Sequence, residues 1–284
     1  MLDDLQGERT MTLDAVDLTA STGSEISVDA ASLLSGRHSA AIRELLVARG
    51  VVVIRGAHFD DDQQRAFTQT MGTVRLGTVY ERENAGMLKI THLDGTYFWH
   101  MDGTYEATPP FASILSARVV PPEGGETEFA NTQAAFEDLP AGEQDRLAAL
   151  EVMHDMRTAM DRAINDPTIE QLAMWMEYRR KQPLVWHRQS GARSLVIGAT
   201  ASYVLGMHPA ESRSLIDGLL AHATQEKYVY RHRWQVGDVV LWDNTRTLHR
   251  VLPHDEQHPR VMHRFTLEGT EPFQGAPELV HVET

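Results

Sequence analysis

Residues 98–105 read FWHMDGTY, and residues 236–250 read VGDVVLWDNTRTLHR. In the first stretch His100 and Asp102 are two positions apart, so both would face the same side of a strand. The second stretch carries a run typical of a buried strand and then His249. Two imidazoles and one carboxylate can occupy one face of an octahedral ferrous ion and leave three positions open, as non-haem Fe(II) oxygenases require.

The phrase His-x-Asp-Gly-Thr-Tyr occurs twice, at residues 92–97 and at residues 100–105. Either His92 with Asp94 or His100 with Asp102 could chelate one ion, and the spacing within the phrase does not choose between them. The pair that is not used is expected to be a solvated or hydrogen-bonded loop pair near the mouth of the site.

Composition narrows the class of protein. A chain of 284 residues with 42% hydrophobic content predicts one domain over residues 1–284. No apolar run approaches the roughly 18 residues of a membrane span, and the amino terminus lacks a hydrophobic signal core, so a cytoplasmic location is expected. The absence of cysteine excludes disulfides, zinc-thiolate sites and iron–sulfur clusters.

A formal charge of −14 argues against nucleic-acid or anionic-membrane partners, because lysine and arginine dominate phosphate binding. An anionic small molecule would therefore need a local basic cluster. The stretch from 246 to 264 is the candidate for that cluster, with Arg246, Arg250, Arg260 and Arg264.

Hydrophobic periodicity and turn residues predict strands both before and after a helical segment. Strands are expected over residues 11–18, 51–55, 111–120, 184–187, 194–197, 228–234, 239–242 and 261–266. Helices are expected over residues 40–48, 60–71, 131–154 (broken at Pro140) and 211–223. Residues 155–183 are expected to be helical or irregular, as a lid or a surface excursion. This order predicts a mixed α/β fold with a mainly β core, a double-stranded β-helix (cupin-like jelly roll) with flanking helices and a helical insert.

Two more phrases complete a recognisable set: VVPPEGGETEF at residues 119–129 and HPRVMHRFTLEG at residues 258–269. Together with the opening stretches they resemble the Fe(II)/2-oxoglutarate-dependent dioxygenases of the taurine/2,4-dichlorophenoxyacetate family. The resemblance covers about residues 38 to 269. It implies ferrous iron, 2-oxoglutarate and O2 as metal and co-substrates.

Carried onto this sequence, the resemblance implies that His100, Asp102 and His249 ligate iron. It also implies that Arg260 and Thr127 bind the distal carboxylate of 2-oxoglutarate, a task suited to the planar fork of a guanidinium. Thr127 stands 25 positions after Asp102. Counted from Asp94 the spacing would not match the family, which favours the second phrase over the first.

Further residues follow from the same resemblance. Arg264 matches a position that contacts the anionic group of the substrate, with a structural ion pair to an acidic side chain as the alternative. If Arg260 and Arg264 lie on one continuous strand, both face the barrel interior. The expected substrate pocket contains Thr96, Tyr97 and Tyr80, and the loop of His249 is expected to be supported by Trp242, Asp243 and Asn244.

The implied reaction is hydroxylation of an unactivated C–H bond of a small, anionic substrate, with release of succinate and CO2. Cleavage of a C–O or C–S bond could follow, and desaturation or cyclisation of a natural product is an alternative outcome. A non-catalytic sensor that binds iron and 2-oxoglutarate is the rival from another class. A metal-dependent hydrolase would leave Arg260 and Thr127 unexplained. The resemblance also implies a homo-oligomer, a dimer or a tetramer.

Overall fold

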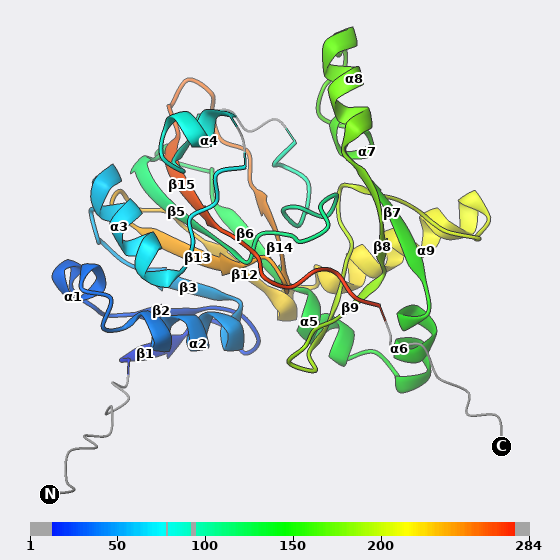
Figure 1. The fold of residues 1–284 in the computed structure, drawn as a ribbon, viewed down its shortest axis with the longest axis horizontal. Helices are drawn as coiled ribbons and strands as arrows, with labels where there is room; N and C mark the ends of the chain where they lie inside the picture. The colour runs from blue at the N-terminus through cyan, green and yellow to red at the C-terminus, as the bar shows by residue number, and fades with distance from the viewer. Residues whose placement is uncertain (1–12, 78, 92–94, 276–284) are drawn as a thin grey trace, which may run out of the picture.

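The computed structural model describes residues 13–77, 79–91 and 95–275. Within these residues the largest element is a seven-stranded sheet (Figure 1). Its neighbouring strands are antiparallel, except that β2 and β3 run parallel. In spatial order the strands are β1 (Ala15–Asp17), β2 (Ser24–Ile26), β3 (Val51–Ile54), β13 (Val239–Asp243), β5 (Ala112–Val119), β15 (Val261–Leu267) and β4 (Leu88–Ile90).

A three-stranded sheet packs against the inner face of the large one. It consists of β12 (Val229–His232), β6 (Thr127–Asn131) and β14 (Thr247–Val251), in that order. Phe129 and Tyr230 from this sheet share one buried cluster with Trp242 and Met262 from the large sheet. Because alternate residues of each strand point into this space, the two sheets enclose a common interior, as the jelly-roll expectation requires.

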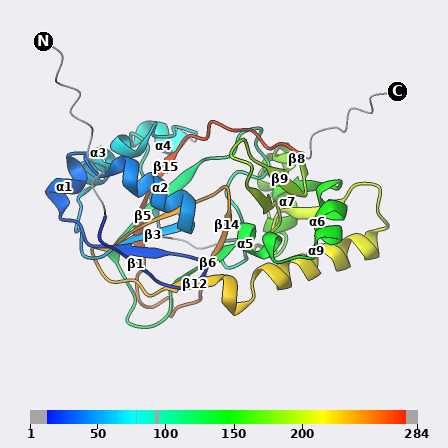
Figure 2. The same ribbon diagram turned by 90° about the horizontal axis from the view of Figure 1, so that it is seen from below.

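Helices cover the outer face of the large sheet (Figure 2). Three of them are α1 (Ala30–Leu34), α2 (Ser39–Arg49) and α3 (Asp61–Met71). The chain leaves α2 through Gly50, whose φ of 75° is unfavourable for other residues. Apolar side chains of the three helices, such as Leu46 and Phe67, pack on Val52 and Leu241 of the sheet.

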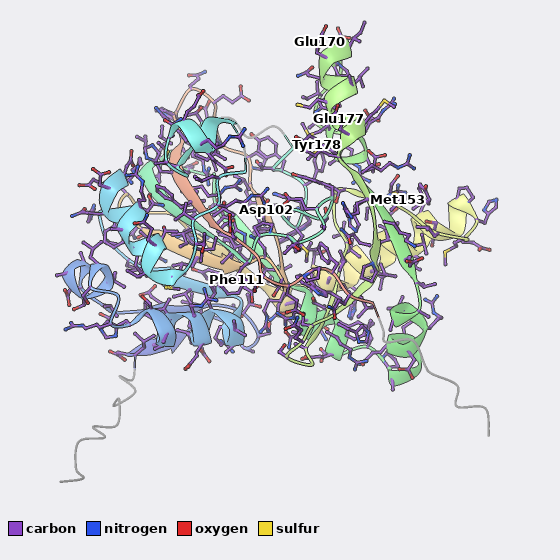
Figure 3. The ribbon with its side chains drawn as sticks, viewed as in Figure 1. Asp102, Phe111, Met153, Glu170, Glu177 and Tyr178 are labelled. Atoms are coloured by element: carbon purple, nitrogen blue, oxygen red, sulfur yellow. The ribbon has the colours of Figure 1, made fainter. Side chains whose placement is uncertain are left out.

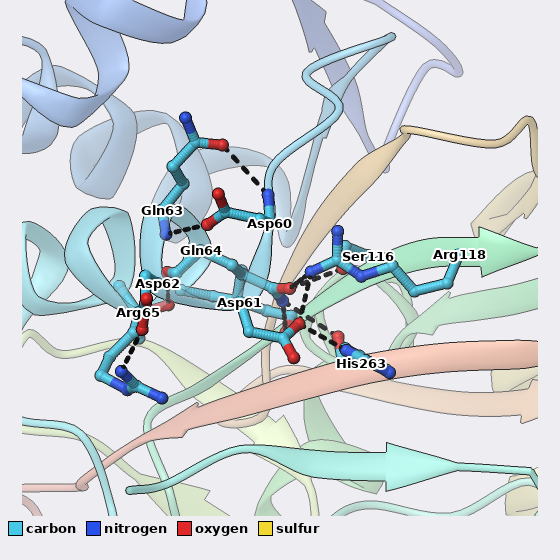
Figure 4. A network of polar contacts seen from close by, with 11 residues as sticks. Asp60, Asp61, Asp62, Gln63, Gln64, Arg65, Ser116, Arg118 and His263 are labelled. Carbon is cyan, nitrogen blue, oxygen red and sulfur yellow. Dashed lines mark hydrogen bonds and ion pairs between the residues drawn. The ribbon is translucent and has the colours of Figure 1, made fainter.

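Polar contacts fix α3 to β5 and β15 (Figure 4). The buried Gln64 donates to the carbonyls of Ile114 (3.2 Å) and His263 (2.9 Å). Asp61 accepts from Arg118 (2.9 Å) and lies 2.6 Å from the His263 ring. These contacts hold the two strands that carry residues of the site described below.

The other half of the molecule has its own buried cluster. Its helices are α5 (Thr132–Glu137), α6 (Ala141–Ala148) and α9 (Pro209–Ala223), and Glu226–Tyr228 forms the 3-10 turn η1. Its short sheets pair β9 (Val185–His187) with β10 (Arg193–Leu195), and β7 (Glu151–Asp155) with β8 (Arg179–Pro183) and β11 (Ala201–Val204). Trp99, Met101 and Leu248 also belong to this cluster, so it reaches the strands that bear the site.

Two of the sequence expectations are wrong here. The helix expected over residues 131–154 ends earlier, because residues 151–155 form β7, in which buried Val152 and His154 alternate with more exposed neighbours. The segment expected to be helical or irregular up to residue 183 ends in β8. Both strands are short and rich in polar residues, so the sequence shows only a weak alternation of apolar and polar positions. Their pairing with each other forms the strands in the folded protein.

Between β7 and β8 lies the insert, with α7 (Met156–Met160) and α8 (Ile169–Glu177). It projects from the body of the molecule, and α4 (Val79–Glu83) lies on the jelly-roll side of the same face (Figure 1). No helix among the described residues has the length and apolar character needed to cross a membrane.

The buried His154 predicts how stability depends on pH. Burial lowers its pKa to about 4, and its ring bonds Thr200 Oγ1 (2.8 Å) and Val196 O (3.3 Å). Since the unfolded chain takes up this proton near pH 6.5 and the folded chain only near pH 4, stability falls as pH drops through that window. The full loss is about 3 kcal/mol.

Urea denaturation at pH 7.5 and pH 5 measures this effect. His154→Gln, which keeps a donor and an acceptor, should flatten the dependence, whereas the exposed His258→Gln should not. An unchanged slope in His154→Gln would contradict the assignment.

Candidate metal centre

Strand pairing brings the three predicted ligands together. His100 forms a two-residue antiparallel bridge with His249 of β14, through backbone bonds of 3.0 and 2.8 Å. The Nε2 atoms of both histidines lie 3.8 Å from Asp102 Oδ1, and the three possible ligand atoms lie within 4.8 Å of one another. Asp102 lies near the middle of the view in Figure 3, below α8, and its side chain is 18% exposed. Residues 149 positions apart in sequence therefore share one site.

Both imidazoles are arranged to offer Nε2 to an ion. His100 Nδ1 lies 2.9 Å from Phe98 O, so this nitrogen carries the proton and Nε2 keeps its lone pair. The His249 ring packs beside Trp242, with centroids 4.8 Å apart. Burial, and then the charge of His100, lowers the pKa of His249 well below its usual range. A neutral imidazole is the form that binds metal.

Asp102 uses its two carboxylate oxygens differently. Oδ1 faces the histidines, whereas Oδ2 accepts from Arg264 Nη1 (3.1 Å) and Ser113 Oγ (3.3 Å). Burial alone would raise the pKa of Asp102, but the charge of Arg264 opposes burial and holds that pKa well below its usual range. The carboxylate is therefore ionised, with one oxygen directed at the place where a cation would bind.

These groups fit a divalent metal ion. Separations of 3.8 Å are too long for hydrogen bonds, but two atoms each about 2.1 Å from one ion can be that far apart. The donors are two neutral nitrogens and one anionic oxygen, the set typical of ferrous oxygenase sites.

A buried cation lies on the β6 side of the site. Arg260 is 4% exposed, and it donates from Nε to Gly125 O (3.1 Å) and from Nη2 to Thr127 Oγ1 (3.4 Å). Thr127 also accepts from Trp234 Nε1 (2.9 Å) and pairs across the sheet with Val251, two residues after His249. Arg260 and Thr127, which the family resemblance implies bind one carboxylate, are thus in contact.

No carboxylate of the described residues forms an ion pair with Arg260, and its burial lowers its pKa to about 10, partly opposed by Tyr97. Buried charges are normally paired, because removing them from water is costly. The guanidinium is therefore suited to receive an anion from outside the chain.

Arg264 does contact the site, but through its ion pair with Asp102, which is the alternative that the sequence left open. Arg260 precedes β15, and the pairing of β15 with β5 shifts register between Val261 and Met262, so the two arginines are not on one continuous strand.

The remaining pocket predictions fare unevenly. Thr96 O accepts from Val251 N (2.9 Å), which joins its loop to β14. Tyr97 lies near enough to Arg260 to affect its pKa. Tyr80 is in α4, but the placement of its side chain is not described, and His92 and Asp94 lie outside the described residues.

The expectation of one basic cluster over residues 246–264 is wrong. Arg246 donates to the carbonyls of Val47 and Ala48 at the end of α2. Arg250 pairs with Glu128 at 2.7 Å and lies over the Trp99 ring. Arg250 points away from the site because it follows His249 in β14, and neighbouring residues of a strand face opposite sides. Arg246 points away because it lies in the turn before β14.

Asp102 and the turn before His249 are held by neighbouring polar side chains, one of which the sequence analysis did not predict. Asn244 Nδ2 donates to Ser113 Oγ (3.3 Å), which in turn donates to Asp102. Asp243 accepts from the backbone of Thr245 (2.8 Å) and shapes the turn before β14. Ser113 was missed by sequence reasoning because an isolated serine in an apolar strand carries no signal until its neighbour is known.

A small cavity adjoins the metal site, lined in part by Asp102, Gly103, Tyr105, Arg75 and Arg264. Gly103 has a φ of 75°, and a Cβ there would lie 2.4 Å from Pro110 Cδ, so only glycine fits beside Asp102. Burial, followed by the charges of Asp102 and Glu106, raises the pKa of Tyr105 to about 12. Tyr105 is therefore a neutral phenol in the wall of this cavity.

Comparison with known proteins gives one consistent family. Residues 14–266 match the family model described as taurine catabolism dioxygenase TauD, TfdA family. The alpha-ketoglutarate-dependent 2,4-dichlorophenoxyacetate dioxygenase of Cupriavidus pinatubonensis is 34% identical over 269 residues, which cover 84% of this chain and 91% of that protein. An alpha-ketoglutarate-dependent sulfate ester dioxygenase of Pseudomonas putida is 33% identical, over 82% of this chain and 81% of the relative.

Solved structures agree with the sequence matches. The crystal structure of AAD-2 in complex with Mn(II) and N-oxalylglycine superposes with a TM-score of 0.82 at 30% identity, covering 93% of this chain and 100% of that one. A taurine dioxygenase from Burkholderia xenovorans gives a TM-score of 0.77 at 29% identity, covering 93% of each chain. The jelly-roll expectation is confirmed, and the chain belongs to the TauD/TfdA family of 2-oxoglutarate-dependent dioxygenases, enzymes of iron, 2-oxoglutarate and O2.

Proposed function

We propose that His100, Asp102 and His249 hold the ferrous ion of this dioxygenase, that Arg260 and Thr127 bind 2-oxoglutarate, and that the enzyme hydroxylates a C–H bond of a small anionic substrate. The observation that carries this assignment is the buried Arg260, which forms no ion pair with a described carboxylate and contacts Thr127. Thr127 pairs across the sheet with Val251, two residues after His249 of the His–Asp–His group. A dicarboxylate that reaches both features would satisfy the ion and the guanidinium together.

Each residue then has a definite task. His100, Asp102 and His249 would hold the ion with three protein ligand atoms, which would leave its other positions to small molecules. Arg264 and Ser113 hold the second oxygen of Asp102, so that the first keeps facing the ion. When bound, ferrous iron couples the oxidative decarboxylation of 2-oxoglutarate to hydroxylation of the substrate, with succinate and CO2 as products.

An anionic substrate is inferred from the relatives. Their names specify phenoxyacetate and phenoxypropionate compounds and sulfate esters. Hydroxylation of the carbon next to an ether or ester oxygen gives a product that collapses with C–O cleavage, so cleavage is the expected outcome for such compounds.

We also infer the role of the insert and the number of domains. The insert is proposed as a lid, which is supported by the edge-on contact of Tyr105 with Tyr178 at 5.2 Å and by the nearness of Met160 to Gly95. One domain is supported by the core that continues into the site strands. A cytoplasmic location, homo-oligomeric assembly and the lack of nucleic-acid and membrane partners stay predictions of the sequence.

The sensor alternative makes a different prediction from the enzyme. Anaerobic Fe(II) plus 2-oxoglutarate should give a visible charge-transfer band in both cases. Admission of O2 should then release succinate from an enzyme, whereas a sensor would bind both molecules without turnover across a broad substrate panel.

Substitution of each proposed ligand tests the metal assignment. His100→Ala, Asp102→Ala and His249→Ala should each abolish succinate release and weaken Fe(II) binding sharply, because each removes one of three protein ligands. Metal content and anaerobic Fe(II) titration provide the measurement, with the exposed His258→Ala as the matched control. Full iron binding by any of the three variants would refute its role as a ligand.

Arg260→Ala tests the co-substrate site. Loss of a buried charge pair costs roughly 2–5 kcal/mol, so the 2-oxoglutarate requirement should rise about 30-fold or more. Iron affinity without 2-oxoglutarate should change little. Titration of 2-oxoglutarate by the charge-transfer band measures the effect, and an unchanged midpoint would count against the assignment.

The duplicated phrase gives a separate test. His92→Ala should leave Fe(II) affinity nearly intact, whereas His100→Ala should remove it. The reverse result would show that the first phrase, rather than the second, holds the metal.

A further inference from the structure

An ion pair separates the cavity beside Asp102 from a wider hollow. The inner cavity has a volume of about 100 Å³, and the outer hollow about 280 Å³. Arg75, Glu106 and Pro110 line both of them. Arg75 Nη2 lies 2.9 Å from Glu106 Oε1, so this ion pair lies where a molecule would pass from the outer hollow towards the metal site.

The backbone fixes Arg75 at this place. Its N–H donates to Thr266 O (2.8 Å), and Val74 forms a bridge with Leu267, so residues 74–75 lie along the end of β15. A Cβ at residue 77 would lie 2.5 Å from Arg75 Nε, so Gly77 leaves the space that the guanidinium occupies. Arg75 is thus positioned by the same strand that carries Arg264.

Two arginines line the inner cavity, and they differ in what holds them. Arg264 donates to the carboxylate that faces the metal position, so a ligand that attracted Arg264 would disturb Asp102. Arg75 is held by Glu106 at the rim, where the side chains are 25% and 27% exposed. Partly exposed ion pairs contribute little net stability, because water solvates either partner once they separate. Glu106 can therefore turn into solvent and release the guanidinium.

We propose that Arg75 is the residue that binds the anionic group of the substrate, in exchange for Glu106, and that it thereby determines the preference for anions. This inference rests on the proposed function. A carboxylate, sulfonate or sulfate offers two oxygens to the planar guanidinium, the same geometry that Glu106 offers in its absence. Tyr105, a neutral phenol beside both groups, provides a wall for the apolar part of such a molecule.

Glu106 is then an internal competitor of the substrate. Its removal takes away the carboxylate that holds the Arg75 guanidinium and leaves the buried Glu81 as the other acidic group of the cavity that acts on Arg75, so anion affinity rises. Removal of Arg75 leaves Glu106, which repels an anion. Opposite effects of two substitutions within one ion pair distinguish direct binding from a structural role of the pair.

The experiment uses the full chain, loaded anaerobically with Fe(II) and 2-oxoglutarate. Binding of 2,4-dichlorophenoxyacetate, of hexyl sulfate and of the neutral 2-(2,4-dichlorophenoxy)ethanol is followed by perturbation of the charge-transfer band. Arg75→Gln should weaken binding of the anions at least tenfold and that of the neutral alcohol less than twofold. Glu106→Gln should tighten anion binding severalfold. Arg146→Gln, which breaks the exposed pair with Glu143 on α6, is the matched control and should have no effect.

Three results would overturn the assignment: anion affinity within twofold of wild type in Arg75→Gln, equal losses for the anions and the neutral alcohol, or no binding of either anion by the wild-type enzyme. Preference between the carboxylate and the sulfate identifies which anion the site takes. Absence of the charge-transfer band in wild type would instead contradict the proposed function, so the two failures are distinguishable.

Discussion

The short backbone bridge between His100 and His249 is the interaction on which the site depends. Its two hydrogen bonds, of 3.0 and 2.8 Å, join a loop to β14 and set the imidazoles side by side, with ring centroids 4.0 Å apart. Gly198 lies against the same segment, where a Cβ would meet Trp99 O at 2.9 Å. Because backbone atoms make this pairing, it fixes where both side chains start, and each ring then needs only one rotamer to face Asp102.

The balance of buried charges explains the contacts of Asp102 and Arg260. Asp102 lies beside Arg264 and two imidazoles, and the charge of Arg264 keeps it ionised although burial favours the neutral acid. Arg260, in contrast, has hydrogen bonds to Gly125 and Thr127 but no ion pair with a described carboxylate. The two arginines therefore differ in their surroundings although they are four residues apart: Arg264 holds Asp102, the proposed metal ligand, and Arg260 is available to an anion. The partly exposed ion pair of Arg75 and Glu106 lies at the rim, and in our proposal its guanidinium is exchanged to an anion.

Sequence reasoning succeeded where the pattern is local or the motif is long. The runs at residues 51–55, 111–120, 239–242 and 261–266 are the central strands of the large sheet. The first and third are almost entirely apolar, a pattern typical of buried strands. It failed for β7 and β8, whose polar residues become strands only by pairing with each other. The basic cluster failed for a different reason: nearness in sequence says nothing about which face of a strand, or which side of a turn, a side chain occupies.

The sequence by itself determined the chemistry, since the identities and spacings of His100, Asp102, Thr127, His249 and Arg260 are properties of the chain and match one family. The tertiary structure decided the partners. In the folded protein Arg264 and Ser113 both donate to the Asp102 carboxylate. Arg246 donates to a carbonyl at the end of α2, and Arg75 lines the rim of the cavity. The physical reason is that a motif of ligand residues is visible in the sequence as residue types at fixed spacings. An ion pair depends instead on distances that arise only when strands far apart in sequence are hydrogen-bonded in register.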